Sequence, residues 1–197
     1  VVIATPTLHL QTCKQLLRSD IAVSSQDVGF KTGYGAFTGE HSADMLIDSG
    51  INWTLTGTII RNMSTSDLQV PLLLQLADRE KGITMDVCAE QLNGIKNALA
   101  TGDWKKVVIA YEPVWAIGTG VTASPEQAQE THAEIRQWIA KNVSAVVAEE
   151  TRIIYGGSAN AKNCNELFAK ADINGFLVGG ASLKAEFVDI INCTQKK

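Results

Sequence analysis

The chain alternates short runs of β-branched and apolar residues with longer segments of helical periodicity. The runs that fit strands are 1–4, 21–24, 53–56, 107–111, 152–155 and 175–178. Residues 107–110 are apolar throughout, which is typical of a strand that is buried on both faces. Strands that alternate with helices in this way predict an α/β fold with a parallel sheet and right-handed crossovers.

Several predicted helices carry start or end signals. Ser124 has the position of an N-cap, and Pro125 that of the first helical residue, where proline is favoured. A second helix is predicted over 84–100, and a third follows Ser182. The segment 67–82 permits two interpretations, a helix with a proline in its first turn or a strand over 72–76. Both stay open at this point.

Composition sets limits on partners and location. The chain has 197 residues and no Pro/Gly-rich linker, so we expect a single domain over 1–197. The net charge is -4 without any block of like charge, which argues against nucleic acid. No apolar run approaches the length of a membrane helix, and the first residues lack the basic flank of a signal peptide. We therefore expect a cytoplasmic protein with no membrane partner.

The four cysteines argue for a reduced compartment. They are widely spaced, form no C-x-x-C pair and have no histidine at metal-ligand spacing. We therefore expect neither a disulfide nor a metal site. A dinucleotide site is also excluded, because no G-x-G-x-x-G follows a strand with an acidic residue about twenty positions further on.

Three strand ends are candidates for chemistry, because parallel α/β folds place their sites at the carboxyl ends of strands. Glu112 ends the run 107–111, where partial burial would raise its pKa and suit it to act as a general base. A capping role or an ion pair with arginine is an equally good interpretation of that position. The other two ends carry glycine pairs at 156–157 and 179–180, each before a helix. Paired turns of this kind in consecutive final units are typical of a phosphate site in a barrel.

Five strings in the sequence resemble the triosephosphate isomerase family. They are YEPVWAIGTG at 111–120, YGGS at 155–158, GFLVGGASL at 175–183, EFVDII at 186–191 and GAFTGE at 35–40. They stand in the family's order and cover nearly the whole chain. The resemblance implies a (β/α)8 barrel and an intramolecular isomerase of glycolysis and gluconeogenesis that interconverts dihydroxyacetone phosphate and D-glyceraldehyde 3-phosphate. It requires no cofactor and no metal.

The resemblance also implies roles for individual residues. Glu112 resembles the base that moves a proton between C1 and C2 of the triose phosphate. The phosphate-binding residues would be Gly118, Ser158, Gly179 and Gly180. The lid and the apolar shield of the base would include Trp115, Ile117, Thr119 and Leu177. The segment 26–40 (Gln26 to Glu40) resembles the loop by which family members dock into a partner subunit, so the resemblance implies a homodimer.

The chain departs from the family pattern in three places. Thr58 stands where the family has its electrophilic histidine, and Ile60 stands where it has a glutamate. The first βα unit, with its substrate-binding Asn and Lys, is expected to be absent, because the sequence opens directly on the second strand. The region 61–84 is expected to be shortened. We therefore count about seven strands, where a complete barrel has eight in about 250 residues.

These departures leave three interpretations of function. The first is a triosephosphate isomerase-like enzyme whose activity is weak because the histidine and lysine are missing. The second is a degenerate, non-catalytic barrel that binds phosphate or a partner subunit. The third is a truncated or misassembled version of a working enzyme, since the losses are blocks while the final strings are intact. None of His9, His41 and His132 fits the electrophile position, and we expect solvated or capping roles for all three.

Overall fold

The computed structural model describes residues 1–29, 35–56, 70–76, 84–99, 101–113 and 123–195. Its internal contacts divide the chain into two compact units, which are described separately. The first unit comprises Val1–Leu73 and Gly94–Val107, and the second comprises Leu74–Asn93 and Val108–Lys197. Within the described residues, none of the helices combines the length and the apolar character that a membrane crossing requires.

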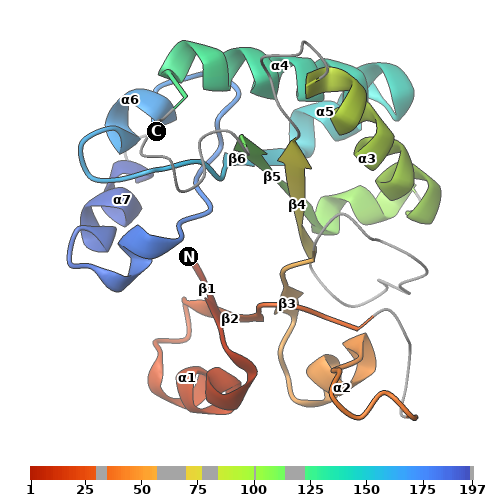
Figure 1. Cartoon of the computed structure of the whole chain (residues 1–197), viewed down its shortest axis with the longest axis vertical. Coiled ribbons are helices and arrows are strands. Elements are labelled where there is room, and N and C mark those ends of the chain that lie inside the picture. The colour runs from red at the N-terminus through yellow and green to blue at the C-terminus, as the bar shows by residue number, and fades with distance from the viewer. Residues whose placement is uncertain (30–34, 57–69, 77–83, 100, 114–122, 196–197) are drawn as a thin grey trace. The chain divides into compact units, whose positions relative to one another are not determined.

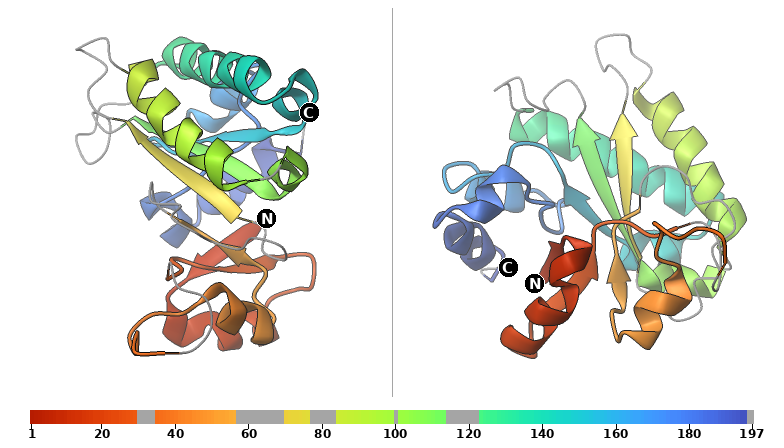
Figure 2. Two further views of the ribbon diagram at one scale, coloured as in Figure 1. Left: turned by 90° about the vertical axis from the view of Figure 1, so that its right-hand side faces the viewer. Right: turned by 60° about the horizontal axis from the view of Figure 1, so that its bottom comes forward.

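The first unit contains a parallel sheet of three strands in the order β1-β2-β3. The strands are β1 (Val2–Thr5), β2 (Ala22–Ser25) and β3 (Trp53–Thr54). The helical elements are η1 (Thr7–His9), α1 (Leu10–Leu16) and α2 (Ala43–Asp48). Both α-helices lie on the same face of this sheet (Figures 1 and 2). Between sheet and helices lies a small core of Leu10, Val23, Leu46 and Ile51.

A second sheet has the order β4-β5-β6, and β5 and β6 run parallel. Its strands are β4 (Val70–Leu76), β5 (Val107–Pro113) and β6 (Arg152–Tyr155). The α-helices that accompany it in the chain are α3 (Thr84–Ala98), α4 (Pro125–Asn142), α5 (Ala145–Glu150), α6 (Cys164–Phe168) and α7 (Phe187–Cys193). The 3-10 helix η5 (Gly180–Leu183) lies in the second unit, whereas η3 (Thr101–Lys106) lies in the first. The predicted alternation of parallel strands and helices is therefore confirmed.

Strand β4 decides between the two interpretations of the segment 67–82. Its bounds confirm a strand within that segment. Pro71 lacks a backbone N–H, and β4 tolerates it because it is the outer strand in the order β4-β5-β6. Residues 67–69 and 77–82 lie outside the described part of the chain.

Helix α4 begins as its sequence predicts. Ser124 Oγ accepts a hydrogen bond from the backbone N of Gln127 at 3.2 Å, and the Gln127 side chain accepts one from Ser124 N at 3.1 Å. This capping box satisfies two backbone donors that a helix start leaves unpaired. Ala128, Ile135 and Ile139 on the inner face are fully buried.

Two expectations about local structure need correction. In α3, an apolar face of Val87, Gln91, Ile95 and Leu99 at i, i+4 spacing is expected from the sequence. Ile95 is buried as expected, whereas the fully buried residues are Cys88 and Leu92, each one position beyond Val87 and Gln91. The predicted strand 175–178 forms only a single bridge, between Tyr155 and Phe176. It still runs beside β6, because Tyr155 N donates to Gly175 O and Leu177 N donates to Tyr155 O.

Candidate functional site

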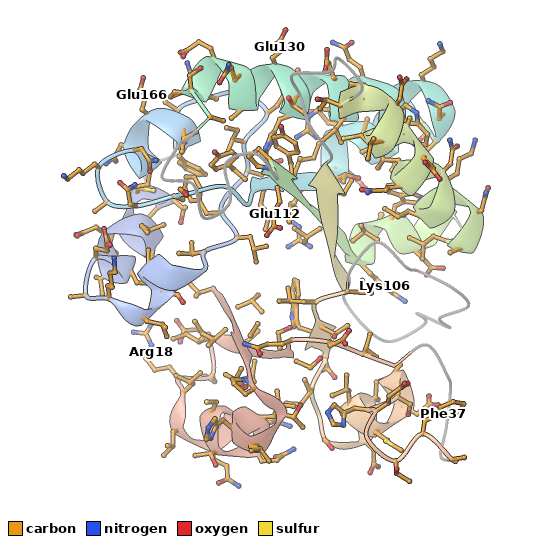
Figure 3. All side chains as sticks on the ribbon, viewed as in Figure 1. Arg18, Phe37, Lys106, Glu112, Glu130 and Glu166 are labelled. Carbon is orange, nitrogen blue, oxygen red and sulfur yellow. The ribbon has the colours of Figure 1, made fainter. Side chains whose placement is uncertain are left out.

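Glu112 stands at the carboxyl end of β5 and points away from α4. Its neighbour Tyr111 packs edge-on against His132 of α4, with ring centroids 5.6 Å apart. Successive side chains of a strand point to opposite faces, so Glu112 faces the other side of the sheet. Figure 3 shows its side chain there.

The environment of Glu112 suits a general base. Its carboxyl is half-buried, and burial raises its pKa, with no charged neighbour among the causes. Among the described residues, no ion pair or hydrogen bond holds the carboxylate, so nothing there supports the alternative of an arginine partner. A carboxylate that is partly removed from water, and that no cation stabilises, is a stronger base than an exposed one.

Gly156 lies directly against Glu112. Its backbone N donates to Tyr111 O at 2.7 Å. A Cβ at position 156 would lie 2.6 Å from Glu112 Cγ, closer than such atoms approach, and 3.1 Å from Tyr111 O, which is also tight. Only glycine therefore fits here without displacing Glu112, and the turn that leads to Ser158 starts beside the carboxylate.

The second glycine pair follows the next parallel segment. Leu177 N donates to Tyr155 O at 2.9 Å, which places this segment beside β6. Gly179 and Gly180 come directly after it and are exposed, and an added Cβ at either would meet nothing within 4 Å. The structure thus brings Glu112, Ser158, Leu177 and the two glycines to the ends of three neighbouring segments.

Comparison with known proteins identifies the family. The family model described as triosephosphate isomerase matches residues 1–64 and 74–194. The cytosolic triosephosphate isomerase of Oryza sativa subsp. japonica is 49% identical over 215 residues, which cover 100% of this chain and 84% of the relative. The triosephosphate isomerase of Neurospora crassa is 50% identical over 210 residues, covering 98% and 84%. That of Candida albicans is 46% identical over 210 residues, covering 97% and 84%.

The chain belongs to the triosephosphate isomerase family. As a triosephosphate isomerase family member it is an isomerase of glycolysis, and its fold is that of an α/β TIM barrel. The alignment with the rice relative runs over 215 residues, whereas this chain has 197, so the relative contains residues that this chain lacks.

Five predicted site residues of this triosephosphate isomerase family member lie outside the described residues. They are Thr58, Trp115, Ile117, Gly118 and Thr119. Of the expected lid, residues 114–123, the structure describes Ala123. The segment Gln26 to Glu40, which is expected to dock into a partner subunit, is described except for residues 30–34.

His132 corrects the expectation of a solvated or capping role. It is fully buried between Tyr111 and Tyr155, and its Nδ1 lies 3.2 Å from Asp172 O. Burial lowers the pKa of His132 to about 4, so the ring is neutral at physiological pH. Burial also raises the pKa of Tyr155 to about 12, against a smaller opposing effect of the Ala123 backbone. Tyr111, His132 and Tyr155 therefore pack together between α4 and the strands β5 and β6.

The other candidate ligands are accounted for by their surroundings. His9 is exposed, and His41 Nε2 lies 2.8 Å from Thr7 Oγ1. All four cysteines are free thiols, and burial raises the pKa of Cys88 to about 12, with Glu134 adding to the effect. Within the described ranges, no group of three or more His, Cys, Asp or Glu side chains could hold a metal ion.

The sequence reasoning missed the polar residues that hold the turn after β6. Asn163 Nδ2 donates to Ser158 O at 2.9 Å, and its Oδ1 accepts from Asn160 N at 2.8 Å. The available signal was two asparagines spaced three apart before a short helix, a pattern that favours turns and caps. That pattern alone does not reveal which carbonyl the side chain reaches.

Proposed function

We propose that Glu112 is the general base of a slow triosephosphate isomerase whose phosphate-binding turns are intact. The raised pKa of Glu112, beside a turn that admits only glycine at position 156, carries this proposal. In it, residues 1–197 form one barrel domain whose substrate is a triose phosphate.

The reaction needs only proton transfer, so no cofactor takes part. The Glu112 carboxylate removes the proton from C1 of dihydroxyacetone phosphate and leaves an enediolate. A proton passes from O1 to O2 of the enediolate, which leaves the negative charge on O1. The same carboxyl then returns a proton to C2, and O1 becomes the aldehyde oxygen of D-glyceraldehyde 3-phosphate. Partial desolvation supports both steps, because it raises the pKa of the carboxyl towards neutral pH.

The remaining site residues hold the substrate and exclude water. Ser158, Gly179 and Gly180 bind the phosphate together with Gly118 of the lid. Their exposed positions at neighbouring segment ends support this role, since the backbone at both glycines is open to a ligand. Leu177, with Trp115, Ile117 and Thr119 of the lid, shields the enediolate from water, which would otherwise favour loss of phosphate.

Position 58 sets the rate. The family places a histidine there to stabilise the negative oxygen of the enediolate, whereas this chain has Thr58. A threonine hydroxyl is shorter than imidazole and does not replace its donor. Loss of one such donor lowers turnover by about 10² to 10³. We therefore place turnover below about 1 s⁻¹, against a typical enzyme median of about 10 s⁻¹.

An internal shortening accompanies this loss. The family match is interrupted between residues 64 and 74, within the region 61–84 where the family pattern breaks. The 215-residue alignment with the rice relative supports a loss of residues, and the interrupted family match supports its place. We infer that the chain is shortened in this region relative to a complete barrel.

A homodimer that uses the loop Gln26 to Glu40 completes the proposal. The ends of this loop are tied by a hydrogen bond from Gly29 N to His41 O at 2.8 Å, and Phe37 near its far end is 45% exposed. An exposed aromatic side chain on a tied loop suits a partner subunit. The name of the rice relative supports a cytoplasmic location.

The second candidate is a barrel that binds phosphate or a partner subunit but does not turn over. Thr58 favours it, because the loss of the electrophile alone could reduce the rate below detection. Binding of inorganic phosphate without any isomerisation would decide for this candidate.

A coupled assay of D-glyceraldehyde 3-phosphate formation tests the proposal. The purified chain is compared with Glu112→Gln, which controls for contaminating host enzyme, and with Thr58→His. We expect turnover below about 1 s⁻¹ that Glu112→Gln abolishes and Thr58→His raises by about 10². Turnover above that limit would contradict the rate-setting role of Thr58, and activity equal in chain and Glu112→Gln would refute the base.

A further inference from the structure

The Asn163 side chain joins the two ends of the turn that carries Ser158. Its Nδ2 donates to Ser158 O at 2.9 Å, and its Oδ1 accepts from Asn160 N at 2.8 Å. Both polar atoms of the amide are thus used within the same turn. The bond from Asn163 to Ser158 thus links the first and last residues of the segment 158–163.

Asn163 does this at a position where asparagine ordinarily has another role. It is the N-cap residue of α6, and an N-cap asparagine usually accepts from a backbone N–H in the first turn of the helix. The Asn163 side chain makes no such capping bond. Its amide is directed backwards to the Ser158 turn, so the geometry favours holding the turn over stabilising the helix.

The same turn is joined to the segment that follows the second glycine pair. Ala161 N donates to Glu186 Oε2 at 3.4 Å, and Glu186 is the N-cap residue of α7. Beneath this contact, α6 and α7 share a buried core of Cys164, Phe168, Ile190 and Cys193. The packed α6–α7 pair therefore holds Asn163 in place, and the hydrogen bond from Asn163 holds the Ser158 carbonyl.

We propose that Asn163 is a positioning residue that sets Ser158 for recognition of a phosphate group. This rests on the proposed function, in which Ser158 binds the phosphate of the substrate. Ser158 itself is exposed, so packing of its own side chain does not fix its position. A binding group held in advance costs less conformational entropy when the ligand binds.

The substitution Asn163→Ser separates positioning from helix stability. Serine caps a helix about as well as asparagine and carries no charge, so α6 and the electrostatics of the site are preserved. Its side chain has no amide N–H and is too short to reach Ser158 O. Asn165→Ser is the matched control, because Asn165 is an exposed residue of the same helix. Among the described residues, the one hydrogen bond of its amide is donated to Cys164 Sγ, at 4.0 Å.

Affinity for inorganic phosphate is measured by calorimetric titration for the chain and both variants, together with each thermal midpoint. We expect Asn163→Ser to weaken binding about tenfold, which corresponds to about 1.4 kcal/mol, with its midpoint near that of the unsubstituted chain. Asn165→Ser should bind within about twofold, which is about 0.4 kcal/mol. Equal affinity in Asn163→Ser and the chain would overturn the proposal, and so would equal weakening in both variants.

A second readout keeps the positioning role separate from the proposed function. The carbonyl ¹³C chemical shift of Ser158 reports its hydrogen bond without any ligand. A shift change in Asn163→Ser and not in Asn165→Ser supports positioning even if the chain binds no phosphate, in which case the proposed function fails alone. An unchanged Ser158 shift in Asn163→Ser would refute positioning whatever the phosphate affinity.

Discussion

Arg136 of α4 makes polar contacts that we expect to matter for the stability of the protein. Its Nε donates to Asp172 Oδ1 at 2.6 Å, and its Nη1 donates to Ala148 O at 2.5 Å and to Thr151 O at 3.0 Å. Its Nη2 donates to Asn174 Oδ1 at 2.9 Å. One guanidinium therefore joins α4, the end of α5 and the segment before residue 175. We predict that Arg136→Met destabilises the protein strongly.

The structure sets the size of this effect. Removing one partner of a buried ion pair costs about 3 to 5 kcal/mol, because the other charge is left without compensation. The Arg136 and Asp172 side chains each remain 19% exposed, which places the loss at the lower end, about 3 kcal/mol. For a chain of this size, that corresponds to a lower thermal midpoint by about 6 to 12 °C.

Arg18→Met is the matched control, because Arg18 also forms an ion pair through its guanidinium. Its contact to Asp20 is 2.9 Å, but the two side chains are 77% and 66% exposed. We expect this variant to lose less than about 0.5 kcal/mol. Urea unfolding of the chain and both variants gives the two losses. A loss below about 1 kcal/mol for Arg136→Met, or equal losses in the two variants, would refute the reasoning from burial.

Three further predictions follow from particular residues. The unfolded chain protonates a histidine near pH 6.5 while His132 does so only at a pKa of about 4, so stability should fall by about 3 kcal/mol as pH drops through that window. Urea unfolding at pH 7 and pH 4 measures this fall, and a His132→Gln variant with the same pH slope would contradict it. Gly156→Ala should displace Glu112 and lower any isomerase activity, whereas Gly94→Ala, in open space within α3, should raise stability by about 0.5 to 1 kcal/mol. Equal activity in the two glycine variants would refute the contact with Glu112. A thiol reagent should label half-buried Cys13 first in the native chain, and mass spectrometry that found earlier labelling elsewhere would contradict the burial of Cys88, Cys164 and Cys193.

Local sequence signals predicted those elements whose causes are local. Helix α4 begins where the capping signal of Ser124 places it, and β5 is buried along its length as its apolar run predicts. The segment 67–82 could not be decided, because Pro71 fits both the first turn of a helix and an outer strand. Its assignment depends on pairing with β5, which is a contact distant in sequence.

The candidate site shows the same division. The positions of Glu112 and the two glycine pairs at segment ends could be predicted, because strand ends and Gly-Gly turns are visible in the sequence. The burial of His132 could not, because it arises from Tyr111 and Tyr155 on two separate strands. The bond from Asn163 to Ser158 O was missed because an asparagine at an N-cap predicts a helix cap.

Deuterium exchange tests the central claim, that Glu112 is a working base, most directly. The chain and Glu112→Gln are incubated with dihydroxyacetone phosphate in D₂O, and loss of the C1 proton signal is followed by NMR. Exchange reports proton abstraction even where complete turnover is too slow to detect. We predict that the chain exchanges C1 protons faster than buffer and that Glu112→Gln does not. Equal exchange in the chain and in Glu112→Gln would contradict the account.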